Sequence, residues 1–370
     1  MRIDLVITEL NVGGAERCLT ELALALHRRG DRVRVASIAP LPHGDQAALV
    51  DRLRAAGITV QSAGCGRTWQ APRAVRFFRR WFAQGRPDVV QTMLYHANVV
   101  GTLAARLAGV PRCIGGVRVA EPKPLRLWIE GRAARRMDAV VCVSQAVRTF
   151  VQHAWGAAAP PMVVIGNAID VGQVDAVPPA DWSEFGWPGD AAVLLFVGRL
   201  HHQKGIDLLV QAAEPLLDRH PEMRCLIAGE GPQRPIAEAF ADRWGNSRVR
   251  LAGWRRDVLE LIKACRLLVL PSRYEGMPNA VLEAMAAGRP VAVTRVEGVS
   301  ELLGERFAEQ SCAPEDSRAL SQLIARLWTS PATCHELGQH NRRQAEARFD
   351  LDAVALQYRQ IYAANPARPD

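Results

Sequence analysis

Short apolar runs alternate along the chain with longer segments in which apolar residues recur at helical spacing. The runs end at turn residues and therefore predict buried strands. In the first half they cover residues 2–7, 33–38, 59–62, 89–91, 113–115 and 139–143, followed by 162–165. In the second half they cover residues 193–197, 225–228, 249–251, 267–270 and 291–294. Strands that alternate with helices predict an α/β fold with doubly wound parallel sheets, in which ligands bind beyond the carboxyl ends of the strands.

The length of the chain, 370 residues, exceeds what one hydrophobic core supports and predicts two domains. Residues 156–190 contain five prolines and separate the two series of strands, so we expect this segment to link the domains. We place the first domain at residues 1–165 and the second at residues 166–350. The tail over residues 320–369 has a helical pattern.

The densest chemical signal follows the strand at 267–270. That strand meets a turn at Pro271, and a helix follows from Asn279, which can serve as its N-cap. The unpaired N–H groups in the first turn of such a helix favour a bound anion. Two carboxylates, Glu275 and Glu283, bracket this helix start. Glu275 could be a solvated loop acid and Glu283 a partner of the helix dipole. Together they predict a pocket for a ligand with both phosphate and hydroxyl groups.

Two cations extend this prediction. Arg199 and Lys204 follow the strand at 193–197, in a loop flanked by glycines that precedes a helix. Their position at the carboxyl end of a strand indicates that they converge on the same anion site. A pair of unconnected surface charges is the alternative.

The first domain offers two weaker candidates. Gly13 and Gly14 open the first helix and let backbone approach a ligand closely, but the loop is not GxGxxG and such turns are often only structural. His96 follows the strand at 89–91, which places it toward the ligand edge of the sheet. A lone histidine is more often structural or exposed.

Positive charge is concentrated in the first half of the chain. Residues 1–175 carry 23 lysines and arginines against 13 aspartates and glutamates, whereas residues 176–370 carry 23 against 25. This asymmetry predicts an anionic partner for the first half: a membrane surface, a lipid diphosphate or a nucleic acid. No recognised nucleic-acid motif accompanies the charge, so nucleic acid is the weakest of the three.

Two stretches, residues 67–86 and 112–136, combine this charge with aromatic residues at helical spacing. The combination is typical of a helix that lies in a membrane interface. The alternative is a surface helix whose aromatic side chains face the core while its arginines face water. The sequence leaves both interpretations open.

Other features exclude several classes of protein. The eight cysteines are scattered singly, without a CxxC pair, and we interpret them as reduced core thiols rather than a disulfide or zinc framework. Asp350 and Asp352 form a DxD, which we interpret as a helix cap and not as a metal site. No apolar run approaches the ~20 residues that span a bilayer, and Asp4 and Glu9 interrupt any signal peptide. We expect a cytoplasmic protein, peripheral on the inner face of the membrane, without a metal or cofactor.

An ordered set of motifs over nearly the whole chain resembles the retaining, GT-B-fold glycosyltransferases of the family 4 type. The motifs are GGAE at 13–16, a histidine after a strand, VIGNAID at 164–170, GRL…KG at 198–205, GEGP at 229–232, and two glutamates separated by seven residues with EAMAAGRPV at the second. One departure is an Asn-Ala where the linker motif usually has Asn-Gly. The resemblance implies two Rossmann-like domains that face each other across a cleft. It also implies a last helix, about residues 351–366, that packs back on the first domain.

The resemblance further implies roles for the candidate residues, with a nucleotide sugar as donor. Arg199 and Lys204 would neutralise the diphosphate of this donor. Glu283 would accept the ribose hydroxyls, and Glu275 would hold hydroxyls of the transferred sugar near the reacting carbon. His96 would contact the donor sugar from the first domain, so Glu275, His96, Arg199 and Lys204 are the catalytic candidates. The remaining implied donor-binding residues are Gly13, Gly14, Gly229, Arg255, Asp257, Val258, Gly276, Met277, Pro278 and Asn279.

The implied activity is that of a retaining, hexosyltransferase-type glycosyltransferase. Fixed cations and helix N–H groups would stabilise the leaving diphosphate, so a divalent metal would not be needed. No well-placed nucleophilic carboxylate is evident, which favours front-face attack. The basic, aromatic first half suggests a glycan or lipid-linked acceptor, as in lipopolysaccharide, polysaccharide or lipid-linked oligosaccharide synthesis. A nucleotide-sugar epimerase or hydrolase and a non-catalytic nucleotide-binding protein are the alternatives.

Overall fold

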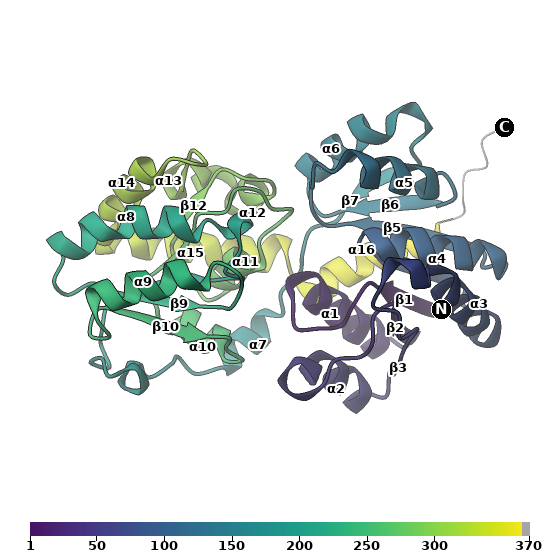
Figure 1. Ribbon diagram of the computed structural model, residues 1–370, viewed down its shortest axis with the longest axis horizontal. Helices are drawn as coiled ribbons and strands as arrows, with labels where there is room; N and C mark the ends of the chain where they lie inside the picture. Colours follow the sequence, from purple (N-terminus) through teal and green to yellow (C-terminus); the bar gives the residue numbers. More distant parts are fainter. Residues whose placement is uncertain (365–370) are drawn as a thin grey trace. The chain divides into compact units, whose positions relative to one another are not determined.

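The computed structural model describes residues 1–364, which form two compact units, each built around its own sheet (Figure 1). Unit 1 comprises Met1–Ala168 and the segment that begins at Leu351, and unit 2 comprises Ile169–Asp350. The chain therefore passes between the units twice, after Ala168 and after Asp350. The first passage lies three residues beyond the boundary expected at residue 165.

Unit 1 contains a seven-stranded parallel sheet in the order β3-β2-β1-β4-β5-β6-β7. Its strands are β1 (Arg2–Ile7), β2 (Arg32–Ser37), β3 (Thr59–Ser62), β4 (Val89–Met93), β5 (Arg112–Val117), β6 (Ala139–Cys142) and β7 (Met162–Val164). Its helices are α1 (Gly14–Arg28), α2 (Ala48–Ala55), α3 (Ala71–Gly85), α4 (Tyr95–Leu107), α5 (Pro124–Ala134), α6 (Gln145–Trp155) and α16 (Leu351–Ala363). Central strands such as β4 and β5 are buried throughout, because helices cover both faces of the sheet.

The two faces of this sheet carry different helices. Side chains from α1, α2 and α16 share a core with Ile3 and Leu5. Side chains from α3 and α4 share the opposite core with Val6, whose side chain points the other way along β1. The strand order explains the division. The chain moves outward from β1 to β3 and then outward again in the other direction from β4. Right-handed crossovers therefore place the two sets of helices on opposite faces.

The final helix, α16, lies against α1 in unit 1 and contributes Val354, Tyr358 and Tyr362 to the first of these cores. It is separated from the preceding helix by a break at residues 349–350. The last residues of the helix expected over about 351–366 lie outside the described part of the chain.

Unit 2 contains a six-stranded parallel sheet in the order β10-β9-β8-β11-β12-β13. Its strands are β8 (Val193–Val197), β9 (Arg224–Ala228), β10 (Val249–Gly253), β11 (Leu267–Leu270), β12 (Val291–Thr294) and the short β13 (Ser311–Cys312). Its helices are α7 (Val171–Ala176), α8 (Ile206–Arg219), α9 (Arg234–Trp244), α10 (Val258–Ala264), α11 (Asn279–Ala286), α12 (Val299–Leu303), α13 (Phe307–Gln310), α14 (Ser317–Trp328) and α15 (Pro331–Arg348). All of these strands except β13 were predicted from the sequence.

The prediction that residues 156–190 link the two domains is wrong for most of this segment. Residues 156–168 belong to unit 1, and residues 169–190 fold onto unit 2 as α7 and a short 3-10 helix at Trp182–Phe185. Trp182, Phe185 and Trp187 are buried, with ring centroids 5.8–6.4 Å apart. The prolines shape turns in this segment, while the aromatic side chains anchor it to a core.

Seven of the eight cysteines are buried, as expected of core thiols, whereas Cys18 is only half-buried. Burial raises the pKa of Cys113 to about 11 and that of Cys225 to about 12, so these thiols are poor nucleophiles and poor metal ligands. None of the helices described here is long and apolar enough to cross a bilayer.

Candidate functional site

Each sheet reverses its strand order at one point, and the site candidates gather at these points. In unit 1 the reversal lies between β1 and β4, and in unit 2 it lies between β8 and β11. Open α/β sheets bind ligands where the loops after two such strands diverge. Gly13 and His96 follow β1 and β4, whereas Lys204 and Glu275 follow β8 and β11.

The central contact of unit 2 is an ion pair between Lys204 and Glu275. The Lys204 Nζ lies 2.5 Å from Glu275 Oε1, and the Ser272 hydroxyl donates to the same oxygen at 2.7 Å. The backbone N–H of Glu275 donates to a carboxylate oxygen of Glu297 at 3.0 Å. Glu275 is buried, and only 17% of the Lys204 side chain is exposed. The structure thus brings together two predicted residues as partners of each other.

Gln203 couples the loop of Lys204 to the loop that follows β11. Its side-chain amide donates to the Tyr274 carbonyl at 2.9 Å, and its backbone N–H donates to His201 Nδ1 at 3.2 Å. The Gln203 side chain is buried between the two loops. Gln203 was not among the predicted site residues, and its only sequence signal is its position directly before Lys204.

Two glycines allow the backbone of these loops to approach closely. Gly205 has φ +66°, and a Cβ there would overlap the carbonyl oxygen of Pro271 at the end of β11. Gly298 has φ +77°, and a Cβ there would overlap the carbonyl oxygen of Gly276. Both positions therefore require glycine for conformation and for space. The position of Lys204 follows from the first of them, because Gly205 ends its turn and begins α8.

Arg199 is not part of the ion pair of Lys204 and Glu275. Its side chain is exposed, and its Nη2 lies 3.3 Å from Gln203 Oε1 within the same loop. It makes no ion pair with any residue that the structure describes, so its charge is available to an anionic ligand.

Arg273 is a further cation beside the site and was not among the predicted site residues. It pairs with Asp207 on α8 at 2.7 Å and with Glu315 at 2.6 Å, and these bonds raise the pKa of its guanidinium. The same pairing lowers the pKa of Asp207. Since two acids already neutralise Arg273, it fastens the loop after β11 to α8 instead of offering charge to a ligand.

Helix α11 carries Glu283 in a buried position, 9% exposed, at the start of its second turn. The helix begins at Asn279, and Pro278 occupies the N-cap position without a side-chain cap bond. The prediction that Asn279 caps the helix is therefore wrong, because Pro278 sets the entry geometry through its fixed φ. Gly276, Met277 and Pro278 form the buried turn that leads into the helix.

Gly229 lies where the ends of three strands meet. It has φ +153°, and a Cβ there would overlap the carbonyl oxygen of Gly198 after β8. Its N–H donates to the carbonyl of Gly253 at the end of β10, at 2.7 Å. The close packing of these loops is enough to require glycine at position 229. The role of Gly229 in donor binding stays a prediction.

Arg255, Asp257 and Val258 lead into α10. Arg255 donates to Asp257 at 2.7 Å and to Glu184 at 2.8 Å, and these bonds raise the pKa of its guanidinium. Val258 is buried. Asp257 and Glu184 already bind the Arg255 guanidinium, and a donor would have to bind it alongside them. The role of this loop in donor binding stays a prediction.

In unit 1, Gly13 and Gly14 open α1. Gly13 occupies the N-cap position in extended backbone, and a Cβ there would overlap the carboxylate of Glu16. Glu16 is buried in the first turn of the helix. Its negative charge favours the helix dipole but opposes an anionic ligand at the same end. If these glycines hold a phosphate, as predicted, the phosphate must lie near the Glu16 carboxylate, which repels it.

His96 lies in the first turn of α4 and is half-buried, with its ring 4.9 Å from that of Tyr95. Burial, together with the charge of Arg126, lowers the pKa of His96 and favours the neutral imidazole. Leu94, directly before this turn, has φ +74°. A positive φ with an extended ψ at a non-glycine residue costs about 1–3 kcal/mol and is concentrated at functional turns.

A buried network supports the turn that carries His96. The Thr92 hydroxyl donates to Asn98 Oδ1 at 2.7 Å, and the Asn98 amide donates to the Gly116 carbonyl at 3.0 Å and to Glu130 Oε1 at 2.7 Å. Burial raises the pKa of Glu130 to about 7. No sequence signal singled out Asn98 or Glu130.

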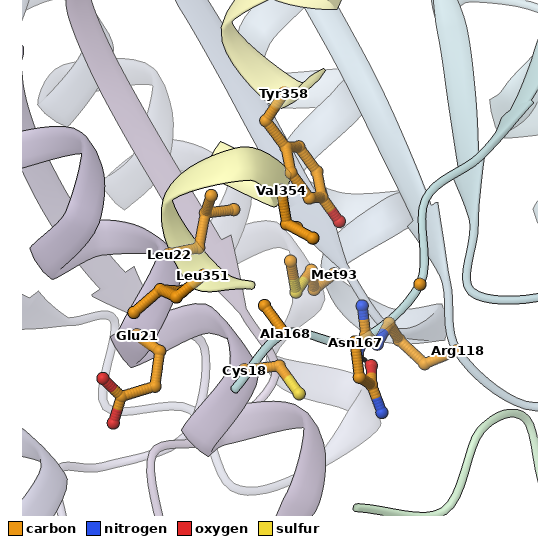
Figure 2. A pocket seen from close by; sticks show the side chains of 11 residues that line it. Cys18, Glu21, Leu22, Met93, Arg118, Asn167, Ala168, Leu351, Val354 and Tyr358 are labelled. Carbon is orange, nitrogen blue, oxygen red and sulfur yellow. Dashed lines mark hydrogen bonds between the residues drawn. The ribbon is translucent and has the colours of Figure 1, made fainter. Parts of the chain in front are cut away.

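A pocket in unit 1 is lined by the buried guanidinium of Arg118, just beyond β5 (Figure 2). Arg118 donates to Asn167 Oδ1 and also interacts with Cys18 and with the Tyr358 hydroxyl. The Glu21 carboxylate points away from it, on the other side of the pocket (Figure 2). Arg118 thus fixes the asparagine of the VIGNAID motif close to the point where the chain leaves unit 1. In the sequence, Arg118 stands out only as one charge in the basic stretch at residues 112–136.

Among residues 1–364, no three His, Cys, Asp or Glu side chains are grouped so that they could hold a metal ion. Asp350 and Asp352 lie on either side of the start of α16 and belong to different units.

Sequence comparisons match both halves of the chain. A Glycosyltransferase Family 4 model matches residues 12–173, and a Glycosyl transferases group 1 model matches residues 191–330. Glycogen synthase of Mycobacterium tuberculosis is 28% identical over 322 residues, which cover 84% of this chain and 72% of that protein. The UDP-Gal:alpha-D-GlcNAc-diphosphoundecaprenol alpha-1,3-galactosyltransferase of Escherichia coli is 29% identical over 235 residues, which cover 60% of this chain and 61% of that protein.

Solved structures share the fold. Anabaena Alr3699/HepE, in complex with UDP-glucose, aligns with a TM-score of 0.82 and 22% identity, and the alignment covers 98% of this chain and 99% of that one. With two parallel Rossmann-like sheets, this likeness confirms the predicted GT-B fold. The chain therefore belongs to the family 4-type GT-B glycosyltransferases and is an enzyme of the hexosyltransferase type.

Proposed function

We propose that this glycosyltransferase moves a sugar from a nucleoside diphosphate donor with retention of the anomeric configuration. The observation that carries the proposal is the ion pair of Lys204 and Glu275 at the switch point of unit 2, beside the start of α11. The diphosphate gains negative charge as its bond to the sugar breaks. The Lys204 ammonium, the unpaired Arg199 guanidinium and the first-turn N–H groups of α11 would stabilise that charge. The UDP-glucose complex of the structural relative supports this choice of donor class.

The two buried glutamates would hold the sugars of the donor. We assign the ribose hydroxyls to Glu283 and the hydroxyls of the transferred sugar to Glu275, since carboxylate oxygens accept hydrogen bonds from hydroxyl groups. Glu275 Oε1 already accepts from Ser272 and Lys204, so Oε2 is the atom that we assign to the sugar. We also assign a catalytic role to His96, whose lowered pKa favours the neutral imidazole.

Retention would follow from front-face attack. The acceptor hydroxyl would form its bond to the anomeric carbon on the face from which the diphosphate departs, and the leaving phosphate oxygen would take the acceptor proton. Glu275 is a poor candidate for a covalent nucleophile because Lys204 and Ser272 already hold its Oε1. Proton NMR of the first product gives the anomeric configuration, and an inverted product would overturn this part of the proposal.

The acceptor that we propose is a glycan carried on a lipid through phosphate or diphosphate, used in cell-surface polysaccharide, lipopolysaccharide or lipid-linked oligosaccharide synthesis. The excess of positive charge in the first half of the chain supports an anionic acceptor. The name of the Escherichia coli relative describes such an acceptor, a sugar on diphosphoundecaprenol. The enzyme would then work at the cytoplasmic face of the membrane. Fixed cations would serve the diphosphate in place of a divalent metal.

The decisive experiment combines labelled nucleotide sugars with a lipid-linked acceptor extract. We expect transfer by the unmodified enzyme and a loss of roughly 10²–10³-fold in kcat/KM for Lys204→Ala. Arg219→Ala is the matched control, since it removes an exposed cation from the far end of the helix that Lys204 precedes. Equal activity of the two variants would mean that Lys204 does not stabilise the leaving group.

Incubation of the enzyme with donor alone separates this proposal from the alternatives. An epimerase or a hydrolase would convert the nucleotide sugar without an acceptor, whereas a transferase leaves it largely intact. A folded protein that binds the nucleotide yet transfers no sugar to any acceptor would instead be a non-catalytic binding protein.

A further inference from the structure

Helices α3, α4 and α5 lie side by side over one face of the unit 1 sheet. Helix α4 packs against α3 on one side and against α5 on the other. Buried side chains of α3 and α4 fill the core between this layer and the sheet. The opposite side of the layer, which we call the outer face of α3–α5, is exposed.

The charge of this outer face has one sign. The three helices contain a single acidic residue, Glu130, and it is buried. Arg106 and Arg126 pair with acids outside the helices. The exposed arginines that form no ion pair with a described residue are Arg73, Arg76, Arg79 and Arg80 on α3, and Arg132, Arg135 and Arg136 in and directly after α5.

Large apolar side chains are exposed among these cations. Leu103 and Leu107 on α4 are 43% and 56% exposed, one helical turn apart. Leu125 and Trp128 on α5 are 70% and 58% exposed, again one turn apart. The Arg132 guanidinium lies 4.5 Å from the Trp128 ring, so cation and aromatic side chain share one exposed spot. Four such side chains on two adjacent helices exceed the scattered apolar residues of an ordinary surface.

The two basic stretches that the sequence left open therefore differ. On α3 the aromatic residues Phe78, Trp81 and Phe82 are buried. This helix is therefore a surface helix whose aromatic side chains face the core while its arginines face water. On α5 the apolar side chains of Leu125 and Trp128 face solvent. Charge comes from α3 and from the end of α5, and exposed apolar surface comes from α4 and α5.

We propose that the outer face of α3–α5 docks on an anionic lipid bilayer. Anionic headgroups would neutralise the unpaired arginines, while Leu103, Leu107, Leu125 and Trp128 would enter the boundary between headgroups and acyl chains. A second copy of this chain is a poor partner, because two such faces repel each other. Nucleic acid would satisfy the arginines but would leave the three leucines without an apolar environment. The inference goes beyond the transfer reaction, since it concerns unit 1 alone and needs neither donor nor acceptor.

Flotation of the full-length protein with phosphatidylcholine vesicles, with and without phosphatidylglycerol, tests the proposal. We expect binding only when phosphatidylglycerol is present, and weaker binding as salt rises. The pair Arg79→Gln and Arg80→Gln and the pair Leu125→Gln and Trp128→Gln should each lower the vesicle partition coefficient roughly tenfold or more. Binding by both pairs at the unmodified level would overturn the proposal.

Matched controls come from the other face of the same sheet. Leu356→Gln replaces a leucine that is 43% exposed on α16, and Arg54→Gln replaces an exposed arginine of α2 that forms no ion pair with a described residue. Both variants should float like the unmodified protein. Hydrogen exchange with vesicles gives a second readout, with added protection over α3, α4 and α5 and none over α2. Protection elsewhere, vesicle binding that does not need phosphatidylglycerol, or binding to an oligonucleotide but not to vesicles would show that the surface has another purpose.

Discussion

Gly205 shows how one residue holds the predicted catalytic lysine in place. Its backbone has φ +66°, and a side chain there would overlap the carbonyl of Pro271. We expect Gly205→Ala to lower the free energy of unfolding by roughly 3 kcal/mol, because left-handed strain adds to a steric clash. Gly57→Ala is the control, with φ +79° at the end of α2 and no atom within 4 Å of the added Cβ, and should cost only about 1 kcal/mol. Denaturant unfolding measures both, and equal losses would mean that the close approach to Pro271 is not real.

Glu130 makes the stability of the fold depend on pH near neutrality. Burial raises the pKa of its carboxyl to about 7, above the ordinary 4.5. Between these values the folded chain binds more protons than the unfolded chain, so this group lowers stability as pH rises through that window. The full effect, at most about 3 kcal/mol, is reached above the folded pKa. We expect Glu130→Gln, which keeps an acceptor for Asn98, to be more stable than the unmodified protein at about pH 8 and equal to it at about pH 4.

Unfolding free energies of both proteins across this pH range decide the matter. Two curves that run parallel at all pH values would show that Glu130 does not titrate with a raised pKa. The same bond network supports the turn with His96, so the pH dependence of transfer should be measured on the Gln variant as well.

At the scale of elements, hydrophobic periodicity predicted nearly all strands because parallel strands covered on both faces are continuous apolar runs. It failed where burial depends on partners distant in sequence. Trp81 and Trp128 both lie in basic, aromatic stretches, yet one is 4% exposed and the other 58%. The cap of α11 was assigned to Asn279 because asparagine is a common cap, but the neighbouring proline took that position.

The candidate site shows the same division. Lys204 and Glu275 were found because charged residues in glycine-containing loops after strands are a local signal. Gln203 and Ser272, which hold them, carry no such signal, because a buried amide or hydroxyl in a loop looks like any polar turn residue. Their roles depend on contacts between the loops after β8 and β11, which only the fold brings together.

The segment once expected to be a linker gives a direct test at this scale. Trp182 is 2% exposed and packs against both Phe185 and Trp187. We expect Trp182→Ala to lower the unfolding free energy by about 3–5 kcal/mol, as for other buried aromatic residues. Trp128→Ala, at an exposed tryptophan, should change it by no more than about 0.5 kcal/mol. Similar small effects at both positions would restore the interpretation of residues 169–190 as a linker.

At the scale of the whole molecule, one of the two units is built from segments that are far apart in the sequence. Unit 2 is continuous, from Ile169 to Asp350, whereas unit 1 needs the segment after Leu351 to complete its core. Ile169 and Asp350 form an isolated β-bridge, and the Ile169 N–H donates to the Phe349 carbonyl at 2.9 Å. The two ends of unit 2 therefore lie side by side. The two points at which the chain passes between the units, after Ala168 and after Asp350, are adjacent for the same reason.

This topology predicts different behaviour for the two halves when they are separated. Residues 169–350 should unfold cooperatively on their own, because every strand of their sheet lies within that range. Residues 1–168 should not, because loss of α16 uncovers the α1 side chains against which Val354, Tyr358 and Tyr362 pack. Joining residue 168 to residue 351 through a short glycine linker should restore cooperative unfolding, since the ends to be joined are adjacent. Thermal unfolding of the three chains measures this, and a stable 1–168 fragment would show that α16 is dispensable to the first unit.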